Sequence, residues 1–267
     1  MTLLLTRAGR AALVLPVLAA VAGCDLAMAD LKAKETAEWR KTYQLQPGGR
    51  VEIANVNGRI AVERTEGNTL EVVALKTARG ASPESAKEAL ARTEIREEVS
   101  PAGVRIETKV ERGGSSFFNK GGVEVAYTVR VPAGADMRFT TVNGGIEVTR
   151  VDGRVDVETV NGGIEAREVA AAAFEASTVN GGIEVDLARM PERGVKLECT
   201  NGGITLRLPR DAKADISARV ANGGIDADGL AVEASERSRR RFEGRLNGGG
   251  PRIEIEGTNG GIQIAPR

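Results

Sequence analysis

The sequence contains no histidine, only two cysteines and few aromatic residues, which make up 3% of its 267 residues. Without histidine, the chain forms neither a Ser-His or Cys-His catalytic pair nor a histidine-ligated metal site. The scarcity of aromatic residues argues against the core of a conventional β-sandwich. Basic and acidic residues number 37 each, so the net charge gives no reason to expect a nucleic-acid partner. We therefore expect a protein that is not an enzyme and that holds no cofactor or metal.

The sequence instead contains a repeated phrase, Asn-Gly-Gly-Ile followed by alternating apolar residues. The first five copies are 18 to 21 residues apart, and the sixth follows after 37. A period near twenty is typical of repeat architectures. Because Asn and Gly readily adopt positive φ, each phrase predicts a turn that leads into a strand. The predicted turns begin at Asn143, Asn161, Asn180, Asn201, Asn222 and Asn259.

Two architectures fit this pattern. Asn-Gly before an alternating strand is also typical of β-hairpins, which would give an antiparallel meander. The constant period favours stacked coils, in which identical residues align in ladders. We predict an all-β fold, a right-handed parallel β-solenoid or β-roll with coils of about 18–21 residues. The last phrase, at Asn259, and the nearby Pro266 predict a final coil at the end of the stack.

The strand after each turn has an inward and an outward side. Residues three and five positions after each Asn are apolar and should face the core. The position between them holds Glu147, Glu165 and Glu184, which should face outward. Like charges directly opposite each other destabilise neighbouring strands, so we expect these glutamates to repel one another.

The N-terminal stretch predicts export. Two arginines precede the apolar run 11–22, which is too short for a membrane span and is typical of a signal peptide over residues 1–29. Residues 21–24, Val-Ala-Gly-Cys, resemble a lipobox in which Cys24 becomes a lipidated N-terminus. The alternative is ordinary secretion with cleavage between Ala29 and Asp30. We favour a lipoprotein anchored in the cell envelope, on its periplasmic or extracellular side, over a secreted soluble protein.

The rest of the chain predicts a tether and one domain. Residues 30–47 are mixed and charged, which favours a tether with a short helix around Ala37. The domain should cover 48–267, with an irregular part (48–140) and regular repeats (141–267). Ser82-Pro83 predicts the start of one helix near 82–93, because Ser is a preferred N-cap and Pro a preferred first residue. Phe117 and Phe118, in a polar loop, are a candidate contact site unless they fold back onto the core.

Several motifs resemble a known family. They are Pro-Gly-Gly-Arg-Val-Glu-Ile at 47–53, Tyr-Thr-Val-Arg-Val-Pro-Ala-Gly-Ala at 127–135, the Thr-Val-Asn-Gly-Gly run, and Gly-Gly-Gly-Pro at 248–251. Together they resemble the "putative adhesin" β-strand-repeat family of bacterial envelope proteins, domain of unknown function 4097, from about Gln46 onward. The resemblance implies a β-solenoid at or beyond the membrane and supplies no catalytic residues.

Two sets of charged residues are candidate binding sites. The first is a basic stretch that could bind an anionic surface polymer or a lipid headgroup, although such a run is also typical of a solvated strand face. Its arginines are Arg237, Arg239, Arg240, Arg241 and Arg245. The second is the column of Glu147, Glu165 and Glu184, which could hold a divalent cation or act on glycans. Cys199 replaces a threonine of the repeat, which favours packing over catalysis.

Three functions fit these observations. The first is a non-catalytic, exported, membrane-anchored module for adhesion or interaction, whose partners are the membrane through its lipid and an envelope protein or anionic surface polymer. The alternative is an envelope-stress sensor or regulator that binds a lipid, a peptide or a protein. The remote alternative is a polysaccharide-active β-helix enzyme.

Overall fold

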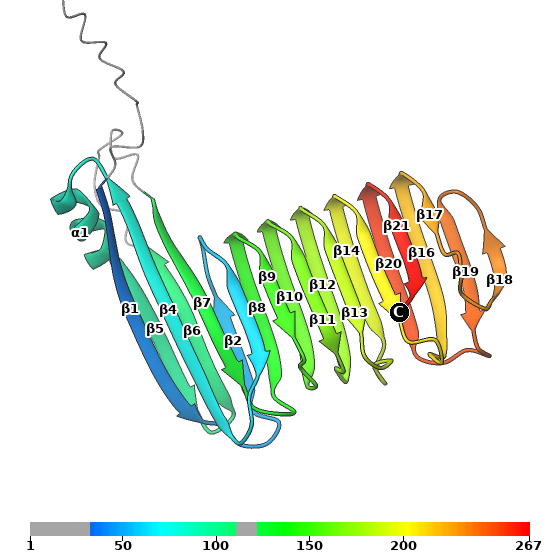
Figure 1. Ribbon diagram of the computed structural model, residues 1–267, viewed down its shortest axis with the longest axis horizontal. Helices are drawn as coiled ribbons and strands as arrows, with labels where there is room; N and C mark the ends of the chain where they lie inside the picture. Colours follow the sequence, from blue (N-terminus) through cyan, green and yellow to red (C-terminus); the bar gives the residue numbers. More distant parts are fainter. Residues whose placement is uncertain (1–32, 111–121) are drawn as a thin grey trace, which may run out of the picture. The chain divides into compact units, whose positions relative to one another are not determined.

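The computed structural model describes residues 33–110 and 122–267, which form two large β-sheets and, within these residues, one helix (Figure 1). The described residues belong to one compact unit, Lys32–Arg267. In spatial order, sheet A contains β1 (Ala33–Gln44), β4 (Thr69–Gly80), β7 (Val123–Val131), β3 (Ile60–Arg64), β9 (Ile146–Thr149), β11 (Ile164–Val169), β13 (Ile183–Leu187), β15 (Ile204–Leu208), β21 (Ile262–Pro266) and β17 (Ile225–Asp226).

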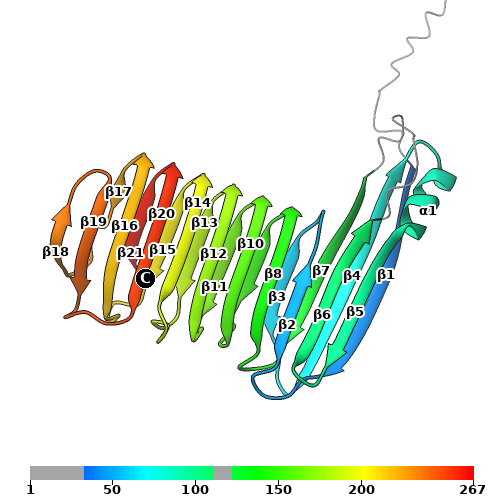
Figure 2. The same cartoon turned by 180° about the vertical axis from the view of Figure 1, so that it is seen from behind.

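Sheet B runs alongside sheet A, and Figure 2 shows the same strands from behind. In spatial order it contains β18 (Val232–Arg237), β19 (Arg241–Leu246), β16 (Ala214–Asn222), β20 (Arg252–Asn259), β14 (Val195–Asn201), β12 (Ala173–Asn180), β10 (Arg154–Asn161), β8 (Asp136–Asn143), β2 (Arg50–Ala54), β6 (Gly103–Val110) and β5 (Thr93–Ser100).

Each regular coil contributes one strand to each sheet. In one coil, β10 ends at Asn161, Gly162 and Gly163 make the turn, and β11 follows in the other sheet. Neighbouring coils pair in parallel and in register, so that Ile164 lies beside both Ile146 and Ile183. The parallel β-solenoid is therefore confirmed, and the antiparallel meander is excluded for the repeats.

The asparagines at the turns form a continuous ladder. From Asn143 onward, each side-chain amide nitrogen donates to the Oδ1 of the asparagine on the preceding coil of the stack, over distances of 2.7 to 3.0 Å. The ladder begins one coil earlier than the regular repeats, at Asn57, and links seven residues. In spatial order these are Asn57, Asn143, Asn161, Asn180, Asn201, Asn259 and Asn222.

The two glycines of each turn differ in what they require. A Cβ on the first glycine, Gly181, would lie 2.1 Å from the carbonyl oxygen of Gly162 on the neighbouring coil, and the φ of Gly181 is +149°. A Cβ on the second glycine, Gly182, would lie 3.4 Å from the nearest atom, which is ordinary contact. Close stacking of the turns therefore requires glycine at the first position, because any side chain there would separate the coils.

Buried threonines also form hydrogen bonds to the backbone of these turns, from the core side. Thr159 Oγ1 donates to Gly144 O at 2.8 Å, and Thr178 Oγ1 donates to Gly162 O at 2.9 Å. The two predicted apolar columns are buried in the coils from Ile146 to Leu206 and in β21, and they form one core shared by both sheets. The last coil departs from this, since Ile225 is only half-buried.

The order of the coils differs from the prediction at the C-terminal end. The coil made by β20 and β21 lies between the coil of β14 and β15 and the coil of β16 and β17. It does not end the stack. Beyond β16, sheet B is completed by the antiparallel strands β19 and β18, so these strands form the C-terminal end of that sheet.

The N-terminal end also differs from the prediction. The predicted tether with a helix around Ala37 is wrong, because residues 33–44 form β1, a strand paired antiparallel with β4. Alternate residues of β1, among them Ala37, Trp39 and Tyr43, pack against the core. The Tyr43 hydroxyl donates to Glu97 of β5, so a hydrogen bond links the two edge strands of sheets A and B.

The helix is confirmed. It is α1 (Pro83–Ala91), and Ser82 caps it by accepting a hydrogen bond from the Ser85 amide. Cys24, both cleavage sites and the Phe117-Phe118 pair lie outside the described residues. Among residues 33–110 and 122–267, no helix is both long and apolar enough to cross a membrane.

Candidate functional site

The glutamate row lies on the outer side of sheet A. Glu147, Glu165 and Glu184 occupy matching positions on three adjacent coils, because the strands that carry them pair in register. They border a groove of about 570 Å³ whose lining includes the second glycine of four successive turns. These glycines are Gly145, Gly163, Gly182 and Gly203.

Arginines neutralise this row. The Arg167 side chain on β11 bridges two coils. Its Nη1 donates to Glu147 Oε1 of the neighbouring coil at 3.0 Å, and its Nη2 bonds to Glu165 on the same strand. Arg207 bonds to Glu184 of the neighbouring coil, and this hydrogen bond raises the pKa of the Arg207 guanidinium. The expected repulsion between glutamates is therefore wrong, because each carboxylate has a cationic partner. Within the described residues, no three His, Cys, Asp or Glu side chains gather as a metal site.

The basic stretch forms β18 and β19, an antiparallel pair that we call the arginine hairpin (residues 232–246). Three of its arginines have acidic neighbours. Arg237 pairs with Asp228, the Arg241 guanidinium lies 3.6 Å from Glu236, and the Arg245 guanidinium lies 3.9 Å from Asp215.

Arg239 and Arg240 differ from the other arginines of the hairpin. Both are exposed at its turn, and neither side chain has a hydrogen bond or ion pair with any residue that the structure describes. Their backbone is nevertheless fixed, because Arg239 O accepts from Ile225 N and Arg240 O from Val220 N, each at 3.0 Å. The fold thus holds two unpaired cationic side chains at the end of sheet B.

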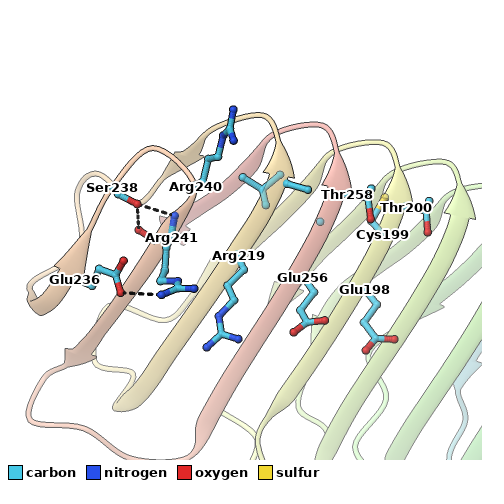
Figure 3. Close-up of a pocket in the computed structure, with 13 residues that line it drawn as sticks. Glu198, Cys199, Thr200, Arg219, Glu236, Ser238, Arg240, Arg241, Glu256 and Thr258 are labelled. Carbon is cyan, nitrogen blue, oxygen red and sulfur yellow. Dashed lines mark hydrogen bonds and ion pairs between the residues drawn. The ribbon is translucent and has the colours of Figure 1, made fainter.

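A hollow of about 800 Å³ lies beside Arg240 (Figure 3). Arg219, Glu256 and Glu198 form one row on its floor, since β16, β20 and β14 pair in register. The hairpin forms its wall, where the Arg241 amide donates to Ser238 Oγ at 3.0 Å. Both signs of charge line the hollow, and the unpaired arginine among its lining residues is Arg240.

Gly257 lines the hollow, and the side chains of Val220 and Ile262 pack on its inner side. It occupies the position where the other coils carry Thr159, Thr178 or Cys199. The Cys199 thiol is 3% exposed and donates to Gly181 O at 3.2 Å, in the manner of the threonines. Burial raises the pKa of this thiol, whereas reactive thiols have a lowered pKa. Cys199 therefore acts as a packing residue.

Sequence reasoning did not find Arg219, Glu198 or Glu256. These residues come together only because β20 lies between β14 and β16, and no local pattern shows that insertion. The one relevant signal is the 37-residue interval before Asn259, which interrupts the regular spacing.

The family model described as Toastrack DUF4097 matches residues 49–265. The chain belongs to the Toastrack DUF4097 family. This confirms the resemblance drawn from the Pro-Gly-Gly and Asn-Gly-Gly motifs. A comparison of this Toastrack chain with proteins of curated function finds no match.

Three solved structures are similar to the Toastrack chain. A "putative cell adhesion protein" from Clostridium sporogenes is 13% identical with a TM-score of 0.49, covering 87% of this chain and 100% of its own. A "putative adhesin" from Bacteroides fragilis is 10% identical with a TM-score of 0.29, covering 86% and 97%. A "putative lipid binding protein" from Parabacteroides distasonis is 10% identical with a TM-score of 0.31, covering 87% and 94%.

Proposed function

We propose that this Toastrack chain is a non-catalytic, lipid-anchored binding module of the cell envelope that captures an anionic surface polymer with the arginine hairpin. One observation carries the proposal. Arg239 and Arg240 are exposed, fixed by their backbone and without an acidic partner in the described part of the chain. The glutamate row, by contrast, has its charges paired with Arg167 and Arg207.

The chemistry of arginine supports an anionic partner. A guanidinium presents its donors in a planar fork that matches carboxylate, phosphate or sulfate groups, and bonds of this kind are about twice as strong as those between neutral groups. Because neither Arg239 nor Arg240 must leave an existing ion pair, binding an anion breaks no contact within the described fold. A polymer with repeated anionic groups would contact both arginines at once.

Export is supported by the sequence of the N-terminal stretch. The signal-peptide pattern of residues 1–29 and the lipobox-like residues before Cys24 favour a mature protein anchored by a lipid at the periplasmic or extracellular side of the envelope. In this proposal the lipid holds the protein at the membrane, and the arginine hairpin binds the polymer.

Charge reversal tests the binding site. We expect Arg239→Glu with Arg240→Glu to weaken binding to dextran sulfate at least tenfold at low salt and to flatten its salt dependence, because two cationic contacts are lost. Binding is measured by biolayer interferometry, and thermal unfolding should be unchanged. Phosphatidylglycerol vesicles serve as a second probe, and binding to vesicles without binding to dextran sulfate would contradict the polymer proposal.

A matched control is Arg193→Glu with Arg210→Glu. These two exposed arginines lie in loops at the opposite end of the strands from the Asn-Gly-Gly turns. The change in net charge is the same, so the control should bind almost as tightly as the native chain. Equal losses in both variants would show that only net charge matters and would remove the hairpin from the proposal.

The anchor and the absence of turnover have separate tests. Mass spectrometry of the mature N-terminus should find an acylated Cys24, and Cys24→Ala should release the protein from membranes. An unmodified chain that begins at Asp30 would contradict anchoring. Glycan cleavage that is abolished by Glu165→Gln would contradict the non-catalytic assignment.

A further inference from the structure

The coil of β20 and β21, which we call the closing coil (residues 252–266), joins two parts of the solenoid that do not otherwise pair. In sheet B, β16 pairs with β20 and β19 but not with β14. In sheet A, β17 pairs with β21 but not with β15. The closing coil is therefore the link through which residues 214–246 are attached to the regular coils by strand pairing.

The closing coil is the last of these elements in the sequence. Residues 214–246 precede the closing coil in the sequence, although the closing coil lies between them and the regular coils. Without the closing coil, a gap one coil wide would separate β14 from β16 in one sheet and β15 from β17 in the other. Both sides of that gap present unpaired parallel strand edges, which readily accept another strand.

The contacts within the gap depend on the repeated phrase. Asn259 donates to Asn201 Oδ1 at 2.8 Å and accepts from Asn222 at 2.9 Å. Ile262 lies beside both Ile204 and Ile225, and the side chains of Ile253 and Ile255 are fully buried. Every one of these contacts is made by residues 252–266, so an identical segment from another molecule would make the same contacts.

The connection into the closing coil is suited to rearrangement. The loop after β19 contains three consecutive residues with positive φ, Asn247 at 49°, Gly248 at 86° and Gly249 at 87°. Asn is one of the residues that adopt positive φ most readily, and the Asn247 side-chain amide donates to Arg210 O at 3.3 Å and to Ala212 O at 2.8 Å. Opening the loop would break these two bonds, after which the glycines allow many other conformations. A Cβ on Gly250 would lie 2.7 Å from Lys213 O in the closed arrangement.

We propose that the closing coil is exchanged between two copies of this chain, so that each copy fills the gap of the other in a closed dimer. The partner is a second copy because its closing coil alone reproduces the asparagine rung, the isoleucine column and the register of both flanking coils. Reciprocal exchange leaves no gap unfilled, and the symmetry is that of a twofold dimer.

Disulfide trapping between copies tests the exchange. Ser217 and Glu254 are direct neighbours across β16 and β20, on the outer face of sheet B. One full-length copy carries Ser217→Cys and the other Glu254→Cys, each with a different tag. Both also carry Cys24→Ser and Cys199→Thr, which remove the two native thiols. After mixing at high concentration and mild oxidation, we expect a covalent heterodimer that carries both tags.

Two further variants make the outcome decisive. A single chain with both Ser217→Cys and Glu254→Cys should form the disulfide in either arrangement, within one chain in the closed monomer and between copies in the exchanged dimer, which checks that the geometry permits the bond. Pairing the Ser217→Cys copy with a Glu175→Cys copy reports random collision, because Glu175 lies in the same outward row on β12, outside the closing coil. Heterodimer yield at least fivefold above that control supports the exchange, and a yield equal to the control overturns it.

The loop provides an independent variant. Gly250→Ala adds a Cβ that would lie 2.7 Å from Lys213 O in the closed monomer, and the proposed opening of the loop would relieve this contact. We expect it to raise the trapped heterodimer several-fold, while Gly182→Ala, which has room for its Cβ, leaves the yield unchanged. A Gly250→Ala protein that folds and gives no increase would contradict the proposed opening of the loop.

Discussion

The regular middle of the solenoid (residues 136–208) and its C-terminal end (residues 214–266) use the same phrase but assemble differently. In the middle, each coil packs on the one that precedes it in the sequence. At the end, the last coil of the sequence is inserted before the preceding one. The phrase therefore determines the shape of a coil and its ladder contacts, but it does not determine the position of the coil in the stack.

The charges of the two regions differ as well. In the middle, Arg167 and Arg207 bond to the glutamates of neighbouring coils, so the outer face of sheet A has little unpaired charge there. At the end, Arg239 and Arg240 extend from the hairpin turn without partners among the described residues. A binding site for an anion is therefore favoured at the end, where the regular pairing stops.

The largest loss of stability is expected from a substitution in a turn of the regular middle. Gly181→Val should destabilise the fold by about 3 kcal/mol or more, because its side chain would collide with Gly162 and the backbone φ is unfavourable for valine. Gly182→Ala is the matched control and should change stability by less than about 1 kcal/mol, since its Cβ has ordinary contacts. Urea denaturation followed by circular dichroism measures both. Equal stability of the two variants would contradict the stacked turns.

The next largest effect is the loss of a buried side chain, which should expose different strands when it is made in the middle and in the closing coil. Leu197→Ala in the middle and Ile255→Ala in the closing coil each remove a fully buried side chain, and each should destabilise by about 2–5 kcal/mol. Hydrogen exchange should show that Ile255→Ala exposes β16, β17 and β19 first, because the closing coil attaches them. If both variants lose protection evenly along the solenoid, the closing coil has no special role.

A smaller effect concerns the ladder. Asn201→Ala removes two side-chain hydrogen bonds from the middle of the ladder, whereas Asn222→Ala removes one at its end. At about 0.5–1.5 kcal/mol for each hydrogen bond, Asn201→Ala should be about twice as destabilising. Thermal unfolding of the two variants provides the comparison, and the reverse ranking would show that the ladder bonds do not add along the stack.

The smallest effect is a pH dependence. Burial raises the pKa of the Cys199 thiol and raises the pKa of Tyr127 to about 12. Each group loses its proton more readily in the unfolded chain, so stability holds at neutral pH and falls as pH rises above the unfolded values, about 8.5 for Cys and about 10 for Tyr. Cys199→Thr should remove the first part of the decline in a series of urea denaturations. A decline below pH 8 would point to other groups.

The sequence predicted the parts of the fold that depend on local spacing. The interval between phrases predicted parallel coils, the asparagine ladder and the inward isoleucines, and Ser82-Pro83 predicted the helix. The strand β1 was missed because its many charges suggested a tether, although Ala37, Trp39 and Tyr43 lie on one side of an extended chain. That period of two was the available signal.

The order of the coils and the pairing of the charged side chains depend on contacts between residues that are distant in the sequence. Asn259 fits any rung of the ladder, so its phrase carries no information about which coils flank it. Arg167 reaches Glu147 on the neighbouring coil as well as Glu165 on its own strand, and Arg207 reaches Glu184 on the neighbouring coil. Only the register of the structure shows which carboxylate of a neighbouring coil each arginine reaches. For the same reason, sequence could name the basic stretch but could not single out Arg239 and Arg240 as its unpaired members.

The position of the closing coil is tested most directly by disulfides within one chain. In a Cys24→Ser and Cys199→Thr background, Lys196→Cys with Glu254→Cys places two thiols on paired residues of β14 and β20. Lys196→Cys with Ser217→Cys places them on strands that would be neighbours only if the coils followed the order of the sequence. We predict rapid disulfide formation in the first variant and none in the second. A disulfide between residues 196 and 217 in the folded monomer would contradict the inserted coil.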